Sequence, residues 1–229
     1  MSSPLRHHSV SRMFLACFAA KTVSRGIMVS FAEREAATDW TERPFSCQDC
    51  RHLEMRASGR CMLGRLCVRD ARARELDAFF AADPQQAGAY LDHVYFEVRA
   101  LAAKYASLFE IVGLLDDREP EVRVMAALRL PLTRIKELRH DRDRKVRVAC
   151  ALRLDGADLL AMAEDADEYV RQTVARRLDP PLLAVLLHDE SADVRLAVAD
   201  RVPRHLVGQL LADPDAQVAE RAKSRLQDQ

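Results

Sequence analysis

The chain contains little glycine and few aromatic residues. Seven of its 229 residues are glycine, one is tryptophan, and aromatic residues make up 6% of the total. So few glycines leave little room for a β-rich enzyme or for an enzyme with a glycine-rich phosphate loop. The sequence also lacks a Gly-x-Ser-x-Gly nucleophile turn and a His-Glu-x-x-His metal pair. These absences predict that the protein is not an enzyme.

An excess of charge of either sign is absent too. The 35 lysine and arginine residues balance 35 aspartate and glutamate residues, so no overall charge attracts nucleic acid or an anionic membrane. No segment approaches the ~20 apolar residues that cross a bilayer. Residues 13–20 form a short apolar run after a basic start, but no Ala-x-Ala cleavage site clearly follows, and Met28 offers an alternative start. We assign residues 1–27 no function and predict a cytoplasmic protein without membrane contact.

The second half of the sequence contains a 24-residue repeat. Five valines recur at this interval, each with an aspartate five residues before it and an arginine seven residues after it. The valines are Val122, Val146, Val170, Val194 and Val218. The aspartates are Asp117, Asp141, Asp165, Asp189 and Asp213, and the later arginines are Arg129, Arg153, Arg177, Arg201 and Arg225. An upstream echo around Val98 keeps the following Arg99 but lacks the aspartate and the later arginine.

Each copy predicts one α-helix and one shorter helix. Apolar residues at the valine and four and eight residues later, as in Val146, Cys150 and Leu154, lie on one helix face. An aspartate or serine three residues before the valine is a candidate N-cap, and prolines end the helix after its leucine. The rest of each copy fits only a very short second helix, of the tighter 3₁₀ kind. Because one copy cannot bury its own apolar face, the copies must stack into an all-α solenoid.

The repeated polar columns predict contacts between copies. The five aspartates can accept hydrogen bonds from backbone N–H groups at the next helix start, or pair with an arginine of an adjacent copy in a ladder. The arginine after each valine and the arginine seven residues after it are about 120° apart around the helix. They cannot form one surface, so we expect one column to support the ladder and the other to face a partner.

Four cysteines precede the repeats in the spacing C-x2-C-x10-C-x5-C, namely Cys47, Cys50, Cys61 and Cys67. Disulfides are the weakest interpretation, because they suit a secreted domain. Zinc would fit the first pair, but the five-residue gap of the second pair departs from the usual structural zinc pattern. An iron–sulfur cubane tolerates unequal spacing because its irons lie at separate corners. From these residues alone, zinc and iron–sulfur fit about equally well.

Basic residues surround the cysteines, namely Arg51, His52, Arg56, Arg60, Arg65 and Arg69. Their positive potential would favour an anionic cluster and raise its reduction potential. Because four cysteines complete a ligand set, we expect His52 beside the ligands and not among them. Arg51, Arg60 and Arg65 are expected in the same surrounding shell or facing a partner.

Three further residues near or beyond the cysteines have expected structural roles. Trp40 and Phe45 should cover the metal site or pack against the first repeat. Cys150 occupies a repeat position at which other copies carry alanine or valine, so it should be a small buried apolar residue.

The block from Asp117 to Leu130 and the cysteines ahead of it resemble the leucine-rich repeat variant family. The resemblance covers the chain from Cys47 to its end and implies a [4Fe-4S] cluster on the four cysteines. It also implies repeats that alternate an α-helix with a 3₁₀-helix in a right-handed superhelix. The family's link to nitrogen fixation is one of genetic setting. Ala219 departs from the pattern, because the other copies carry arginine after the valine.

These observations divide the chain into four predicted parts. They are an N-terminal segment (1–45), a four-cysteine domain (46–75), a helical junction or degenerate first repeat (76–113) and five repeats (114–229). We predict a non-enzymatic scaffold that binds an unidentified protein partner and senses redox state or transfers electrons. The family resemblance implies a link to nitrogen fixation, and the oligomeric state is not predicted. The cluster could instead be structural only.

The alternative is a nucleic-acid-binding repeat protein with a structural four-cysteine metal site. Its main support is a basic turn that contains Arg139, His140, Arg142, Arg144, Lys145 and Arg147. Asp141 and Asp143 lie within the same turn, so internal ion pairs are the favoured interpretation over a phosphate-binding patch.

Overall fold

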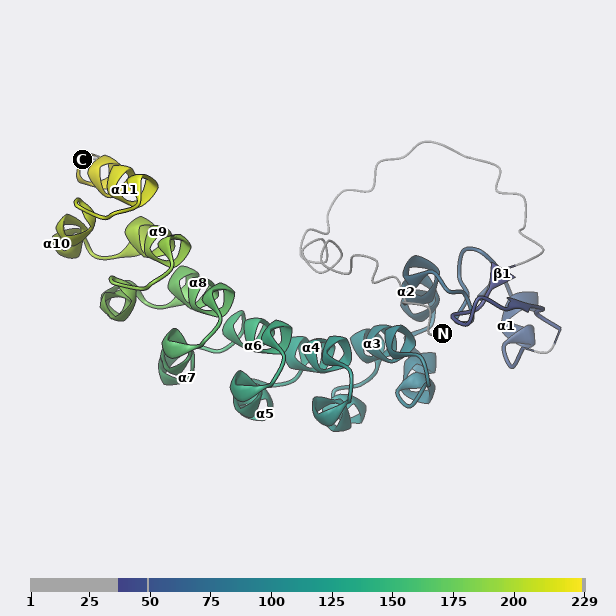
Figure 1. The fold of residues 1–229 in the computed structure, drawn as a ribbon. Helices are drawn as coiled ribbons and strands as arrows, with labels where there is room; N and C mark the ends of the chain where they lie inside the picture. Colours follow the sequence, from purple (N-terminus) through teal and green to yellow (C-terminus); the bar gives the residue numbers. More distant parts are fainter. Residues whose placement is uncertain (1–36, 49, 228–229) are drawn as a thin grey trace, which may run out of the picture. The chain divides into compact units, whose positions relative to one another are not determined.

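The computed structural model describes residues 37–48 and 50–227. The expectations for residues 13–20 and Met28 fall outside these residues. Figure 1 shows the repeat helices following one another in chain order. In the part of the chain that is described, no helix is both long and apolar enough to cross a membrane.

The cysteine region contains little regular structure. Strands β1 (Ala37–Thr38) and β2 (Pro44–Phe45) form an antiparallel hairpin, which the all-α prediction did not include. The five-residue helix α1 (Leu53–Ala57) follows. Helices α2 (Ala73–Ala82) and η3 (Pro84–Tyr90) then lead into the repeats.

The repeats alternate an α-helix with a short helical segment that is partly or wholly 3₁₀, which confirms the predicted architecture. In chain order the elements are α3 (Phe96–Tyr105), η4 (Glu110–Asp116), α4 (Pro120–Arg129), α5 (Leu132–Ile135), η5 (Lys136–His140), α6 (Arg144–Ala151), α7 (Gly156–Leu160), η6 (Ala161–Glu164), α8 (Glu168–Arg177), η7 (Pro180–Leu186), α9 (Ala192–Arg201), α10 (Arg204–Val207), η8 (Gly208–Leu210) and α11 (Ala216–Gln227). The echo around Val98 is therefore a repeat helix, α3.

Local sequence explains where these helices begin. The side chains of Asp143 and Asp167 accept hydrogen bonds from backbone N–H groups in the first turns of α6 and α8, and Pro120 occupies the first turn of α4. Both features satisfy or remove N–H groups that a helix start leaves without partners. The predicted cap Ser191 precedes α9 without such a side-chain bond.

Stacking buries the apolar column of each repeat. All five repeat valines are fully buried, and so is Cys150. The α-helices pack against one another in sequence, α3 on α4, α4 on α6, α6 on α8, α8 on α9 and α9 on α11. Burial of each such side chain contributes about 1.5–3 kcal/mol, so the stack as a whole forms the core that no single repeat could form.

Candidate metal centre

Turns and short bridges bring the four cysteines to one region. Cys47 follows β2, and its carbonyl accepts a hydrogen bond from the N–H of Cys50 (3.2 Å). The loop from Cys61 to Cys67 closes through a bridge between Met62 and Leu66. Gly64 permits this turn, because its φ of 77° lies in the left-handed region that favours glycine.

The sulfur atoms share an apolar environment. Cys47 and Cys67 form a buried cluster with Phe45 and Leu63, Cys61 is also buried, and Cys50 is half-buried. All four are free thiols in the structure, which gives no support to a disulfide pair.

The thiols also interact electrostatically. Cys61 and Cys67 share a side-chain hydrogen bond, which raises the pKa of Cys61 and lowers that of Cys67. Burial adds to the rise at Cys61, and charges on Cys47 and Cys50 contribute further. The other three sulfurs therefore lie within electrostatic reach of Cys61.

This donor set fits an iron–sulfur group. Four soft sulfur donors, three of them buried among apolar side chains, match the ligands that such clusters use. Within residues 37–48 and 50–227, no three cysteine, histidine or acidic side chains converge closely enough to hold one metal ion. Cys47, Cys50, Cys61 and Cys67 are therefore the residues that would hold such a group.

His52 lies next to the ligands with both ring nitrogens engaged. Its Nε2 contacts the Tyr90 hydroxyl, and its Nδ1 lies 3.1 Å from the sulfur of Met55. Burial lowers its pKa, so the ring is neutral at neutral pH. Burial also raises the pKa of Tyr90 to about 12. His52 therefore joins the cysteine loop to η3. The sequence did not indicate Tyr90, because nothing local marks a partner 38 residues away.

The arginines of this region mostly pack on neighbours of the cysteines. Arg51 lies over the ring of Tyr90 (5.4 Å to the centroid) and Arg69 over that of Phe45 (4.6 Å). Arg60 pairs with Asp83 at 3.1 Å. Arg65 is exposed, with its Nη1 3.9 Å from the Met62 sulfur. These cations surround the centre without occupying it.

Phe45 and Trp40, the aromatic residues before the cysteines, were expected to cover the metal site or to pack against the first repeat, and each does one of these. Phe45 lies in the cysteine core. Trp40 contacts His93 edge-on, with ring centroids 4.5 Å apart, and stacks on Tyr95 at 6.0 Å. Phe45 thus covers the centre, and Trp40 packs against the turn that precedes α3.

The aspartate column forms an ion-pair ladder between repeats. Each aspartate binds the arginine 18 residues earlier through two N–H···O contacts of 2.7–3.1 Å. Its Oδ1 also accepts the backbone N–H two residues later. The pairs are Arg99–Asp117, Arg123–Asp141, Arg147–Asp165, Arg171–Asp189 and Arg195–Asp213. Each aspartate therefore both accepts a backbone N–H bond and pairs with an arginine of the adjacent repeat, the two roles that the sequence offered as alternatives.

We expected the second arginine column to face a partner, but its side chains bind within the repeat array. Its guanidinium groups donate to backbone carbonyls at the end of the preceding repeat helix, as Arg177 does to Ala151 (2.7 Å) and Leu154 (2.6 Å). The residues that do so are Arg129, Arg153, Arg177, Arg201 and Arg225. These carbonyls have no acceptor role inside their own helix, so the column caps each helix from the next repeat.

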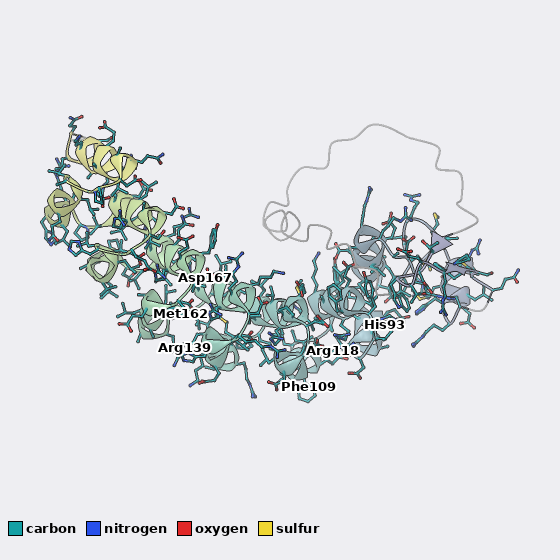
Figure 2. All side chains as sticks on the ribbon, in the orientation of Figure 1. His93, Phe109, Arg118, Arg139, Met162 and Asp167 are labelled. Carbon is teal, nitrogen blue, oxygen red and sulfur yellow. The ribbon has the colours of Figure 1, made fainter. Side chains whose placement is uncertain are left out.

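The basic turn is largely neutralised within the protein. Arg139 pairs with Asp158 (2.6 Å), Lys145 with Glu121 (2.7 Å), and Arg144 approaches Asp167 at 3.5 Å. Arg139 and Asp167 are labelled in Figure 2. Arg147 belongs to the ladder. Internal pairing on this scale does not favour a phosphate-binding surface.

Comparison with known proteins agrees with this structure. Residues 37–89 match a family model described as "LRV protein FeS4 cluster", a region that extends beyond the predicted 46–75 domain on both sides. The chain is 40% identical over 82 residues to an uncharacterized 27.7 kDa protein in the nifB 3′ region of Rhodobacter capsulatus. That alignment covers 36% of this chain and 34% of the relative, so the chain matches only about a third of the relative's length.

A solved structure gives a longer match. It is described as a leucine-rich repeat variant with a novel repetitive protein structural motif, and it is 35% identical to this chain with a TM-score of 0.75. The match covers 80% of this chain and 78% of the solved one. The chain therefore belongs to the leucine-rich repeat variant family, with the cysteine region that the family model associates with an iron–sulfur cluster.

Proposed function

We propose that this protein is a non-enzymatic redox scaffold in the cytoplasm, in which Cys47, Cys50, Cys61 and Cys67 hold a [4Fe-4S] cluster beside a partner-binding repeat array. The observation that carries the proposal is the burial of Cys47, Cys61 and Cys67 within the region that the iron–sulfur family model matches. Reduced thiols that bind a metal group suit a reducing compartment.

The residues around the sulfurs tune such a centre. A bound [4Fe-4S] group supplies one-electron transfer at a potential set by charge, hydrogen bonds and solvent exposure. Phe45 and Leu63 keep water from Cys47 and Cys67. Cys50 is the least buried of the four, so its side offers the shortest route to a redox partner. The arginines nearby stabilise added negative charge and so favour the reduced state.

The repeats supply the surface for a protein partner. Both arginine columns of the repeats bind groups within the array. The exposed apolar side chains of the repeats are therefore the better candidates for contacts with a partner. Phe109 is 91% exposed at the start of η4 (Figure 2), and Val185 on η7 is 60% exposed. Burial of such exposed apolar side chains against a partner would favour association.

We place this scaffold in nitrogen fixation because the Rhodobacter capsulatus relative is described by its position in the nifB 3′ region. Loss of the gene should then slow growth on dinitrogen and leave growth on ammonium unchanged. Equal growth of the deletion strain on both nitrogen sources would remove this part of the proposal.

The scaffold role is tested by affinity purification from cells that fix nitrogen, with Phe109→Asp and Val185→Asp variants beside the natural chain. Glu164→Gln, which alters an exposed residue on η6, is the matched control. We expect the same captured protein with the natural chain and the control, and weaker capture with one or both aspartate variants. Equal affinity of that protein for the oxidised, reduced and cluster-free chain would exclude a redox switch.

A further inference from the structure

The ladder begins with a histidine where the other repeats carry aspartate. His93 stands 24 residues before Asp117, and its Nδ1 accepts the N–H of Tyr95 at 3.2 Å, as Asp117 accepts that of Glu119 at 2.9 Å. Arg99 donates to the carbonyl of His93 at 2.7 Å, as Arg123 does to that of Asp117 at 2.7 Å. The turn at His93 therefore has the same hydrogen bonds to its backbone as the turns at the ladder aspartates, and we call each of these a ladder turn.

The ion pair of a ladder turn is missing at this position. The arginine that would pair with an aspartate at position 93 would stand 24 residues before Arg99, where the chain carries Glu75. An aspartate there would lack its guanidinium partner. The imidazole keeps the hydrogen-bond acceptor of the turn without adding a negative charge.

Trp40 contacts this turn in place of the guanidinium. Its indole meets His93 edge-on at 4.5 Å and stacks on Tyr95 at 6.0 Å. Such aromatic pairs are directional and prefer these two arrangements. The first ladder turn thus depends on a side chain that comes from the β1–β2 hairpin.

The other end of that hairpin lies in the cysteine core. Phe45 of β2 packs with Cys47 and Cys67. The hairpin turn is fixed by Asp39, which accepts hydrogen bonds from Thr41 (2.8 and 2.6 Å). The N–H of Ala71, four residues after Cys67, donates to the carbonyl of Thr38 at 3.1 Å. Residues 37–45 therefore form a short braced segment between the sulfurs and the repeats.

We propose that residues 37–45 are a coupling arm, through which occupancy of the cysteine centre orders the first repeat by way of Trp40 on His93 and Tyr95. The proposal rests on the proposed cluster as the occupant. It differs from the scaffold role, because it specifies the route by which a change at the sulfurs reaches the repeat array. Loss of the occupant loosens Phe45, the hairpin moves, and the turn at 93–95 loses its cover.

Hydrogen exchange of the full chain, followed by mass spectrometry, tests the arm. Peptides covering 93–101 are compared in protein purified without oxygen and in the same protein after chelation, with iron and sulfide analysis of each sample. We expect exchange in these peptides to rise several-fold on chelation, and no change in peptides from α9. In Trp40→Ala, exchange at 93–101 should be fast with or without the cluster.

Two variants support the reading of this experiment. Trp40→Phe keeps an aromatic contact if alanine prevents folding, and should show an intermediate effect. Tyr169→Ala removes a half-exposed aromatic residue from α8 and should leave the response at 93–101 intact.

Two results would overturn the arm. Exchange at 93–101 that does not respond to chelation in the natural chain would show that the sulfurs and the turn are independent. A full response in Trp40→Ala would route the coupling elsewhere, through His52 and Tyr90. A chain that binds no iron or sulfide would instead refute the proposed cluster, which the metal analysis reports separately.

Discussion

Arg123 and Asp141 form a buried two-point ion pair that joins consecutive repeats. The guanidinium Nε lies 2.7 Å from Oδ2 and Nη2 lies 2.8 Å from Oδ1, and the two side chains are only 5% and 7% exposed. Arg123 also donates to the carbonyl of Asp117. One arginine therefore fixes its own turn and holds the next one.

Removing one partner of this pair should destabilise the protein strongly. We expect Asp141→Asn to lower the free energy of unfolding by about 3–5 kcal/mol, because it leaves a buried guanidinium without its counterion. Urea unfolding followed by circular dichroism measures this. Glu121→Gln is the control, since Glu121 pairs with the half-exposed Lys145, and it should cost at most about 1 kcal/mol. Equally small decreases in the free energy of unfolding of both variants would show that the ladder contributes little to stability.

Much of this fold could be predicted from the sequence. The 24-residue period placed each repeat valine in the core, and Pro131, Pro180 and Pro203 each marked the end of the helix before it, because these are local consequences of helix geometry. The aspartate column was predicted to bind arginine, since identical positions in stacked copies must meet one another. Periodicity could not decide which arginine column makes the ladder.

The candidate centre was less predictable. The cysteine spacing indicated a metal group, but the packing of His52 on Tyr90 and of Trp40 on His93 joins residues far apart in sequence. No periodic pattern relates such positions. The second arginine column was misjudged because its partners are backbone carbonyls, which leave no trace in the sequence.

The ladder should also make the protein sensitive to acid. Burial alone would raise the pKa of Asp117 and Asp141, but hydrogen bonds from Arg99 and Arg123 bring it below its usual value. The pKa of Asp213 is lowered chiefly by its hydrogen bonds with Arg195. Stabilisation from these carboxylates is complete above the unfolded pKa of about 3.9 and is lost as pH falls through the lower folded value.

The free energy of unfolding measured against pH checks this expectation. The contribution of these carboxylates to the free energy of unfolding should stay nearly constant between pH 7 and about pH 5, and should decrease below about pH 4. Asp141→Asn should show a shallower fall. A natural chain whose stability is unchanged down to pH 3 would contradict a ladder held by ionised aspartates.

Substitution of two adjacent arginines distinguishes the stability gained from helix capping from that gained from general surface charge. Arg177 donates to two carbonyls of the preceding repeat, whereas its neighbour Arg176 is exposed. We expect Arg177→Ala to cost about 1.5–3 kcal/mol, because charge-assisted hydrogen bonds are lost. Arg176→Ala should stay within about 0.5 kcal/mol of the natural chain. Denaturant unfolding of both variants distinguishes the roles, and equal effects would argue against capping.

Cys150 should be chemically inert in the folded protein. Burial raises the pKa of its thiol to about 12, so the reactive thiolate is scarce at pH 8. Peptide mapping after iodoacetamide treatment should find Cys150 unmodified in the native chain and modified in urea. Rapid modification of native Cys150 would contradict its place in the repeat core.

We propose that the four cysteines ahead of the repeats hold a [4Fe-4S] cluster. Absorption of the protein purified without oxygen, with iron, sulfide and zinc analysis per chain, tests it most directly. We expect a broad band near ~400 nm and about four irons and four sulfides per chain, the composition of such a cluster. Cys61→Ser should lose them and Cys150→Ser should retain them. A colourless protein with one zinc per chain would contradict the account.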